Sequence, residues 1–351
     1  MWSGRLFRTI ASLAFYLRAL ELINRFVNRF RPNRSANGRL AFPFVRKTRA
    51  ANFQILVYHR VNDEHDPFFP AVPTEVFRKR MEYLASHFTV CPLQNGVDML
   101  RRGDLPDNAL ALTFDDGYRD NYLNAFPILK QLGLPATIFL PTAAISYGIT
   151  LWHDRVFWAF RETEVTVVGN FGGKNETYFM PSPREKLSVL QHVLSVLRAM
   201  NVIERETSIG RLLTKLGVPA RNGIGDLMLS WDEIRIMHQN GITFGSHSCT
   251  HPILSKLSTE DVRSEVLESK DIIEKEVGTQ VTAFAYPSGR AEDFDARTKG
   301  ILKEEGYSCA LTTIFGANQK AQDPFELRRG GPWEAHLPTF ALKLNWYKFN
   351  D

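Results

Sequence analysis

From residue 53 onward, short apolar segments alternate with longer segments whose apolar residues recur at helical spacing. The apolar segments, each typical of a buried strand, are residues 54–58, 109–112, 136–140, 242–245, 281–284 and 307–311. The intervening segments that predict helices are residues 74–87, 121–132, 231–240, 258–277 and 294–305. This order indicates parallel strands joined by crossover helices, and therefore an α/β fold. With 351 residues, the chain can form one large domain with additions.

The alternation is interrupted between residues 144 and 229. This interval contains Trp152-His153-Asp154, an expected hairpin around residues 170–174 and a helical stretch over residues 183–216. It is long enough to form a subdomain or lid over a site at the strand ends. The predicted organisation therefore has three parts: a leader and linker over residues 1–50, one α/β unit over residues 51–143 and 230–351, and an insert over residues 144–229.

Positive charge is concentrated near the N-terminus. Residues 1–50 hold eleven Lys or Arg and one acid, Glu21, which gives a net charge of +10. Since the whole chain carries +5, residues 51–351 sum to −5. The body is mildly acidic, so we expect no nucleic-acid partner. Residues 31–50, with two prolines and many basic residues, predict a linker.

Residues 5–30 predict a basic amphipathic helix. Apolar residues recur at three- and four-residue steps on one face, and four arginines gather on the other. The longest uncharged run, residues 9–17, is too short to span a bilayer, and no small-residue cleavage site follows it. Two interpretations are open. The helix lies on an anionic membrane surface, or it packs onto the domain with its arginines solvated.

Two adjacent carboxylates, Asp115 and Asp116, follow the predicted strand 109–112 closely and precede Gly117. Taken alone, such a sequence more often caps a loop than forms a site. If both side chains are buried, their repulsion must be offset by a cation or a shared proton. The pair therefore becomes informative only when other candidate ligands join it.

Two histidines, His247 and His251, follow the predicted strand 242–245. In a helical turn, their four-residue spacing places both imidazoles on one face and Cys249 on the other. Functional groups gather at the C-terminal ends of the strands in parallel α/β barrels, so one of the two aspartates is expected to meet both histidines. Two imidazoles and a carboxylate suit a catalytic zinc ion, with cobalt, nickel or iron as alternatives. The three cysteines are odd in number and widely spaced, which indicates neither a disulfide framework nor a thiolate metal site.

A third segment, residues 285–289, follows the predicted strand 281–284. Its proline and glycine fix a turn, from which the backbone N–H of Ser288 is expected to face the strand ends as an oxyanion donor. Together, residues 113–118, 247–251 and 285–289 resemble the motifs of the polysaccharide deacetylase family, the NodB-homology group of carbohydrate esterase family 4. Residues 55–61 resemble the start of the branch that includes poly-N-acetylglucosamine deacetylases. The resemblance covers about residues 53–330, excluding most of the insert.

This resemblance implies a distorted (β/α) barrel that removes N-acetyl groups from amino sugars with the help of a metal ion. By position, Asp115 matches the catalytic base of the family. The residues that match its metal ligands are Asp116, His247 and His251. The residues expected to contact the substrate are Tyr118, Tyr286 and Pro287.

The chain departs from the family pattern at two places. The third motif usually begins with an arginine that orients the base, where this chain has Ala285, and carries an aromatic residue where it has Ser288. Arg328, in a late segment that resembles a motif of the related branch, is the candidate to orient Asp115. The Leu-x-His motif that supplies the general acid in many members cannot be placed. His59, at the end of the first strand, is the candidate proton donor, and a purely structural role is its alternative.

The expected function is N-deacetylation of amino sugars in a polysaccharide or a lipid-linked glycan. The alternatives are removal of a formyl group or hydrolysis of another amide on the same scaffold, and a non-catalytic glycan-binding homologue. The basic leader without a secretory signal favours a cytoplasmic protein peripheral to the inner membrane. A membrane-anchored enzyme that faces the periplasm is the alternative.

Overall fold

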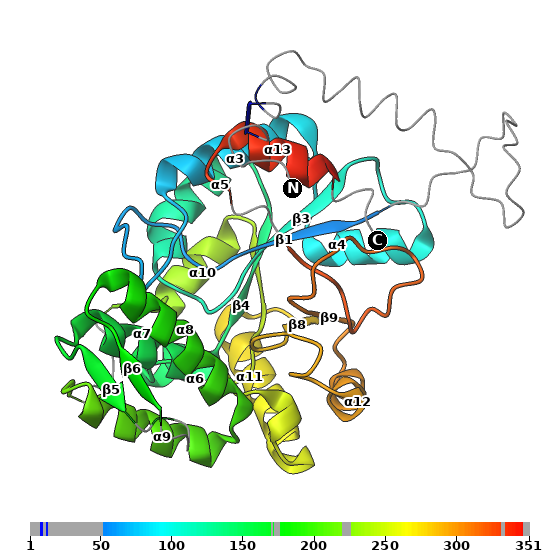
Figure 1. Ribbon diagram of the computed structural model, residues 1–351. Helices are drawn as coiled ribbons and strands as arrows, with labels where there is room; N and C mark the ends of the chain where they lie inside the picture. Colours follow the sequence, from blue (N-terminus) through cyan, green and yellow to red (C-terminus); the bar gives the residue numbers. More distant parts are fainter. Residues whose placement is uncertain are drawn as a thin grey trace, which may run out of the picture.

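Figure 1 shows a computed structural model, which describes residues 52–169, 171, 176–219, 226–330 and 334–346, together with residues 8, 9 and 12. Its centre is a parallel sheet with the strand order β1-β3-β4-β7-β8-β9, and β2 pairs with β3. The strands are β1 (Gln54–Tyr58), β2 (Thr89–Val90), β3 (Ala109–Phe114), β4 (Ala136–Leu140), β7 (Ile242–Ser246), β8 (Ala283–Ala285) and β9 (Cys309–Leu311). The six predicted strands are confirmed, with ends that shift by at most two residues.

Helices connect and cover these strands. They are α3 (Thr74–His87), α4 (Leu93–Arg102), a π-helical turn η1 (Asn121–Ala125), α5 (Phe126–Leu132), α6 (Thr142–Tyr147), α10 (Trp231–Gln239), a 3-10 turn η2 (Leu254–Lys256), α11 (Thr259–Val277), α12 (Ala296–Glu304) and α13 (Leu337–Trp346). The predicted helix 121–132 is divided into η1 and α5. Pro127 in the first turn of α5 has no N–H to continue an α-helical ladder there. The five predicted helices are otherwise confirmed, while α4, α6 and α13 were not predicted.

Alternate strand residues face two different cores. In β3, Leu110 and Leu112 pack in the large cluster under the outer helices, whereas Ala109 and Ala111 belong to a smaller cluster that includes Phe139. Beyond β9, residues 327–330 make parallel bridges to Leu311 of β9 and to Leu56 of β1. This segment therefore links the two edge strands, and the sheet curls as the predicted distorted (β/α) barrel requires.

The insert forms a lobe with a core of its own, drawn in green in Figure 1. Its elements are α7 (Trp152–Glu162), β5 (Val167–Gly169), β6 (Thr177–Phe179), α8 (Pro183–Ala199) and α9 (Val202–Lys215). The strands β5 and β6 pair antiparallel, while most of the turn predicted around residues 170–174 lies outside the described residues. The predicted helical stretch 183–216 is two helices, each opened by a capping box. Phe68 and Phe69 from the loop after β1 join this core.

The predicted leader helix and the linker lie outside the described residues, except for residues 8, 9 and 12, which are helical. There, Ser12 Oγ lies 3.3 Å from Nε2 of His336, just before α13. Within the described ranges, every helix is too short or too polar to cross a lipid bilayer.

Candidate active site

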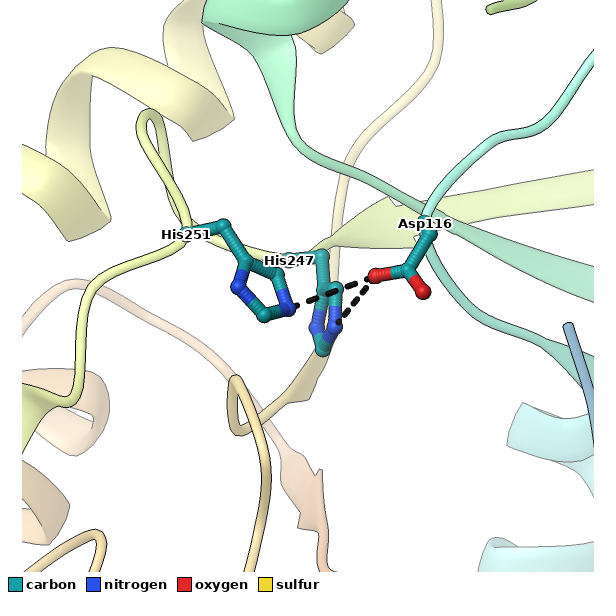
Figure 2. Close-up of side chains that lie close together, drawn as sticks. All are labelled: Asp116, His247 and His251. Atoms are coloured by element: carbon teal, nitrogen blue, oxygen red, sulfur yellow. Dashed lines mark ion pairs between the residues drawn. The ribbon is translucent and has the colours of Figure 1, made fainter. Parts of the chain in front are cut away.

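Asp116, His247 and His251 converge where β3 and β7 end (Figure 2). Asp116 Oδ1 lies 3.5 Å from His247 Nε2 and 3.3 Å from His251 Nε2. One ligand atom from each residue lies within 4.8 Å of the others, and all three side chains are buried. The structure thus brings together the three ligands predicted from two separate strand ends.

The chemistry of this group fits a divalent metal ion. Asp116 Oδ1 is buried and receives no hydrogen bond. His247 Nδ1 lies 2.7 Å from the carbonyl oxygen of Ala285, and donation there leaves the Nε2 lone pair facing Asp116. Burial by itself would raise the pKa of Asp116, but its contacts with His247 and His251 hold that pKa well below the ordinary value. An ionised carboxylate beside two imidazole nitrogens is a suitable donor set for zinc.

The two histidines reach this group from a loop, so the predicted helical turn is wrong. Ser248 (φ 63°) and His251 (φ 59°) adopt left-handed backbone conformations, which break a helical path. The N–H of His251 donates to Ser248 Oγ. A carboxylate oxygen of Glu265, from α11, accepts hydrogen bonds from the N–H groups of Cys249 and Thr250. These tertiary contacts, and not helical spacing, make both imidazoles converge.

Asp115 is held by Arg329, and the prediction that Arg328 orients it is wrong. Arg329 Nη1 donates to Asp115 Oδ1 and Nη2 donates to Oδ2, each over 2.7 Å. Arg329 Nε donates to the carbonyl oxygen of Thr312, which fixes the guanidinium. Because successive side chains of an extended segment point to opposite sides, Arg328 lies elsewhere, against Gly316. The prediction identified the correct segment but chose Arg328 in place of its neighbour Arg329.

The Arg329 contact determines the charge of Asp115. Burial alone would raise the pKa of Asp115, but the Arg329 guanidinium, followed by His247, lowers it below the ordinary value. Asp115 is therefore ionised at neutral pH. An ionised, firmly oriented carboxylate next to the Asp-His-His group can accept a proton from water.

A cavity of about 990 Å³ opens beside both carboxylates. His59, Tyr118 and Ser288 line it, as predicted for residues that act on a substrate. His59 Nε2 lies 4.0 Å from Asp116 Oδ2, and the His59 carbonyl oxygen accepts a hydrogen bond from Asn121 Nδ2 in η1. The structure thus places these residues at the site, while the proton-donor role of His59 and the oxyanion role of Ser288 stay predictions.

Tyr286 and Pro287 do not line this cavity, so the predicted substrate contacts are wrong. Tyr286 is completely buried, its hydroxyl donates to the carbonyl oxygen of Phe325, and its ring stacks on Phe294 at 4.2 Å. Pro287 is buried as well. Both residues support the turn from which Ser288 reaches the cavity.

The insert contributes site residues to which the sequence assigned no role. His153, in the first turn of α7, places Nε2 3.2 Å from the Tyr118 hydroxyl and 4.0 Å from Asp116 Oδ2. The Tyr118 hydroxyl donates to Asp154 Oδ1 over 2.8 Å. The only sequence signal was an adjacent His-Asp pair near the start of the insert, which says nothing about where α7 packs.

Asp154 predicts a pH dependence of stability. Burial, and then the charge of Asp116, raise the pKa of Asp154 to about 8, although the Tyr118 hydrogen bond and Arg60 act in the opposite direction. An unfolded aspartate ionises at ~3.9. Because the folded protein keeps this proton to higher pH than the unfolded chain, the contribution of Asp154 to the free energy of unfolding falls as pH rises from ~4 to ~8, by at most ~1.4 kcal/mol per pH unit.

We therefore expect Asp154→Asn to remove this contribution. In metal-stripped protein, urea unfolding should show the variant gaining stability over the parent between about pH 5 and about pH 8. The exposed Asp107 offers a control, because Asp107→Asn should keep the parent's slope. Identical slopes in parent and Asp154→Asn would contradict the expectation.

A family model described as polysaccharide deacetylase matches residues 102–310, a range that contains both carboxylates and both histidines. The chain belongs to the polysaccharide deacetylase family. The resemblance inferred from the motifs is thereby confirmed, and membership supports a hydrolase of the carbohydrate deacetylase class.

Relatives of this deacetylase-family chain include two bacterial proteins. It is 22% identical to a Bacillus subtilis protein named as a polysaccharide deacetylase, YxkH, over 82% of the chain and 73% of that protein. It is 34% identical to the poly-beta-1,6-N-acetyl-D-glucosamine N-deacetylase of Escherichia coli K12 over 24% of the chain, but this match spans only 13% of that protein.

Two solved structures share the fold of this deacetylase-family chain. The Streptococcus pyogenes deacetylase PplD in complex with acetate has a TM-score of 0.55 at 19% identity, covering 80% of the chain and 92% of PplD. IcaB from Ammonifex degensii has the same TM-score and identity, covering 84% of the chain and 97% of IcaB. Both confirm the predicted barrel architecture.

Proposed function

We propose that this protein is a metal-dependent N-deacetylase that removes acetyl groups from N-acetylated amino sugars of a polysaccharide or a lipid-linked glycan. The observation that carries the proposal is the buried Asp116-His247-His251 group beside an Asp115 carboxylate held by Arg329. Zinc is the proposed ion for this donor set, with cobalt, nickel or iron as alternatives. The cavity along these residues gives an N-acetyl sugar access to them.

In the proposed reaction, Asp116, His247 and His251 would hold the ion, which supplies Lewis-acid polarisation of the acetyl carbonyl and acidifies water. Asp115 accepts a proton from the water molecule as the water oxygen attacks the amide carbon. The N–H of Ser288 stabilises the negative charge that develops on the carbonyl oxygen. His59 donates a proton to the nitrogen as the C–N bond breaks, which yields acetate and a free amino sugar.

Product analysis tests this function. Zinc-loaded protein is incubated with N-acetylated glycans, including poly-β-1,6-N-acetylglucosamine and a lipid-linked amino sugar, and released acetate is measured. Formate release from an N-formylated sugar without acetate release would support the deformylase alternative. Glycan binding without either product would support a non-catalytic homologue.

We further propose that residues 5–30 hold the protein on the cytoplasmic face of the inner membrane. Deleting residues 1–35 is then expected to move the protein from the membrane fraction to the soluble fraction, because the basic residues of this segment supply the attraction to anionic lipid. Zinc content should stay unchanged, since all three proposed ligands lie in the barrel. Full-length protein found in the soluble fraction at physiological salt would contradict this placement. Cleavage by protease added outside intact spheroplasts would support the periplasmic alternative.

A further inference from the structure

The cavity next to the carboxylates has one wall built by the insert. Gln191, Leu194 and Arg198 of α8 line it, and they occupy one face of that helix at three- and four-residue steps. Arg198 lies in the last turn of α8. The same cavity contains Asp115 and Asp116, so a substrate at the carboxylates can extend along this face.

Three arginines line the cavity, and they differ in what they bind. Arg60 Nε donates to Asp120 over 2.8 Å, and Arg80 Nη2 donates to the carbonyl oxygen of Glu334 over 2.8 Å. Arg198 is half-buried, and among the described residues no carboxylate oxygen lies within 4.0 Å of its guanidinium. Arg198 thus differs from Arg60 in having no carboxylate in direct contact, and from Arg80 in donating no hydrogen bond to a backbone carbonyl among the described residues.

The loop after β8 brings three charged groups near Arg198. Burial, and then the positive charge of Arg290, lower the pKa of Arg198, while Asp293 and Glu292 act in the opposite direction. Both acids interact with Arg290: Glu292 lies 3.9 Å from its guanidinium, and Asp293 accepts a hydrogen bond from its backbone N–H. A partly desolvated cation without a direct counterion gains strongly from an incoming anion.

We propose that Arg198 binds an anionic group of the substrate, a phosphoryl or carboxylate group next to the acetylated sugar, so that the insert selects acidic over neutral glycans. This inference rests on the deacetylase function proposed above. The planar guanidinium fork matches either oxyanion through two hydrogen bonds. Phe157 and Leu194 line the same cavity and reduce the competition from water.

The test measures ligand binding by calorimetry on zinc-loaded, full-length protein. The probes are neutral N-acetylglucosamine, N-acetylglucosamine 1-phosphate, and the disaccharide of N-acetylglucosamine with glucuronic acid. We expect the parent to prefer one anionic probe over the neutral sugar by about tenfold, or ~1.4 kcal/mol, as charge-assisted hydrogen bonds allow. Which anionic probe is preferred distinguishes phosphoryl from carboxylate recognition.

Arg198→Gln should lose this preference. Arg184→Gln is the matched control, because Arg184 is an exposed residue of the same helix outside the cavity lining, and it should keep the preference. An unchanged preference in Arg198→Gln, or a parent that prefers neither anionic probe, would overturn the proposal. If Arg198→Gln does not fold, Arg198→Lys is used instead, and it should show a reduced preference because it keeps the charge without the fork.

The two proposals can fail separately. Binding needs no turnover, so a protein that releases no acetate but shows the Arg198-dependent preference would reject only the deacetylase function. A protein that releases acetate but shows no such preference would reject only the role of Arg198.

Discussion

Asparagine in place of Asp115 is expected to lower the rate of acetate release about a thousandfold, within the range typical for loss of a general base. The zinc content should stay near that of the parent, because Asp115 is not among the three proposed ligands. The amide nitrogen of asparagine cannot accept a proton from water, although the amide fills nearly the same volume. Metal analysis and acetate release on the same preparations measure both effects.

The comparison variant is His247→Ala, which should lose zinc and activity together. In the parent, His247 Nε2 lies 3.5 Å from Asp116 Oδ1, and alanine at this position would leave the ion with one proposed ligand fewer. The exposed Asp107→Asn variant controls for the general effect of an Asp-to-Asn change. Equal loss of zinc in Asp115→Asn and His247→Ala would refute the division between base and ligand.

Alanine in place of Arg329 is expected to cost both stability and rate. The change leaves the Asp115 charge buried without its partner, and breaking a buried ion pair typically costs about 3–5 kcal/mol. The neighbouring Arg328→Ala variant is the matched control and should stay close to the parent, because its side chain does not reach Asp115. Urea unfolding measures the stability, and acetate release measures the rate.

Two further variants separate charge from geometry at this pair. Arg329→Lys keeps the charge but lacks the fork that bonds both carboxylate oxygens, so it should recover part of the stability and less of the rate. In an Asp115→Asn background, Arg329→Ala should cost less than in the parent, because the two residues interact directly. If Arg328→Ala proves more harmful than Arg329→Ala, the assignment of Arg329 is wrong.

The strands could be predicted because they carry a strong local signal. All residues of β3 and of β4 are buried, and each strand is apolar except for one threonine, so it stands out in the sequence. Since parallel strands end at a common edge, one of the two aspartates could be expected to meet His247 there, and the motif resemblance indicated Asp116. The Asp-His-His group followed from topology that a single sequence was able to indicate.

The errors arose where long-range contacts decide the local geometry. The four-residue spacing of His247 and His251 is equally compatible with a loop, and the contacts of Glu265 from α11 determine that it is one. Whether Arg328 or Arg329 faces Asp115 depends on bridges to β1 and β9, which hydrophobic periodicity does not reveal. His153 was missed because its role depends on how the insert packs against the barrel.

The segment that joins β9 to β1 also delivers the guanidinium that aligns Asp115. Closing the barrel and orienting the proposed base Asp115 therefore depend on the same segment. If the bridges of residues 327–330 to β1 and β9 were broken, the two imidazoles would stay near Asp116. Asp115, the proposed proton acceptor, would then no longer be aligned by Arg329. Loss of activity is then expected when this segment separates from the sheet, before the helices unfold.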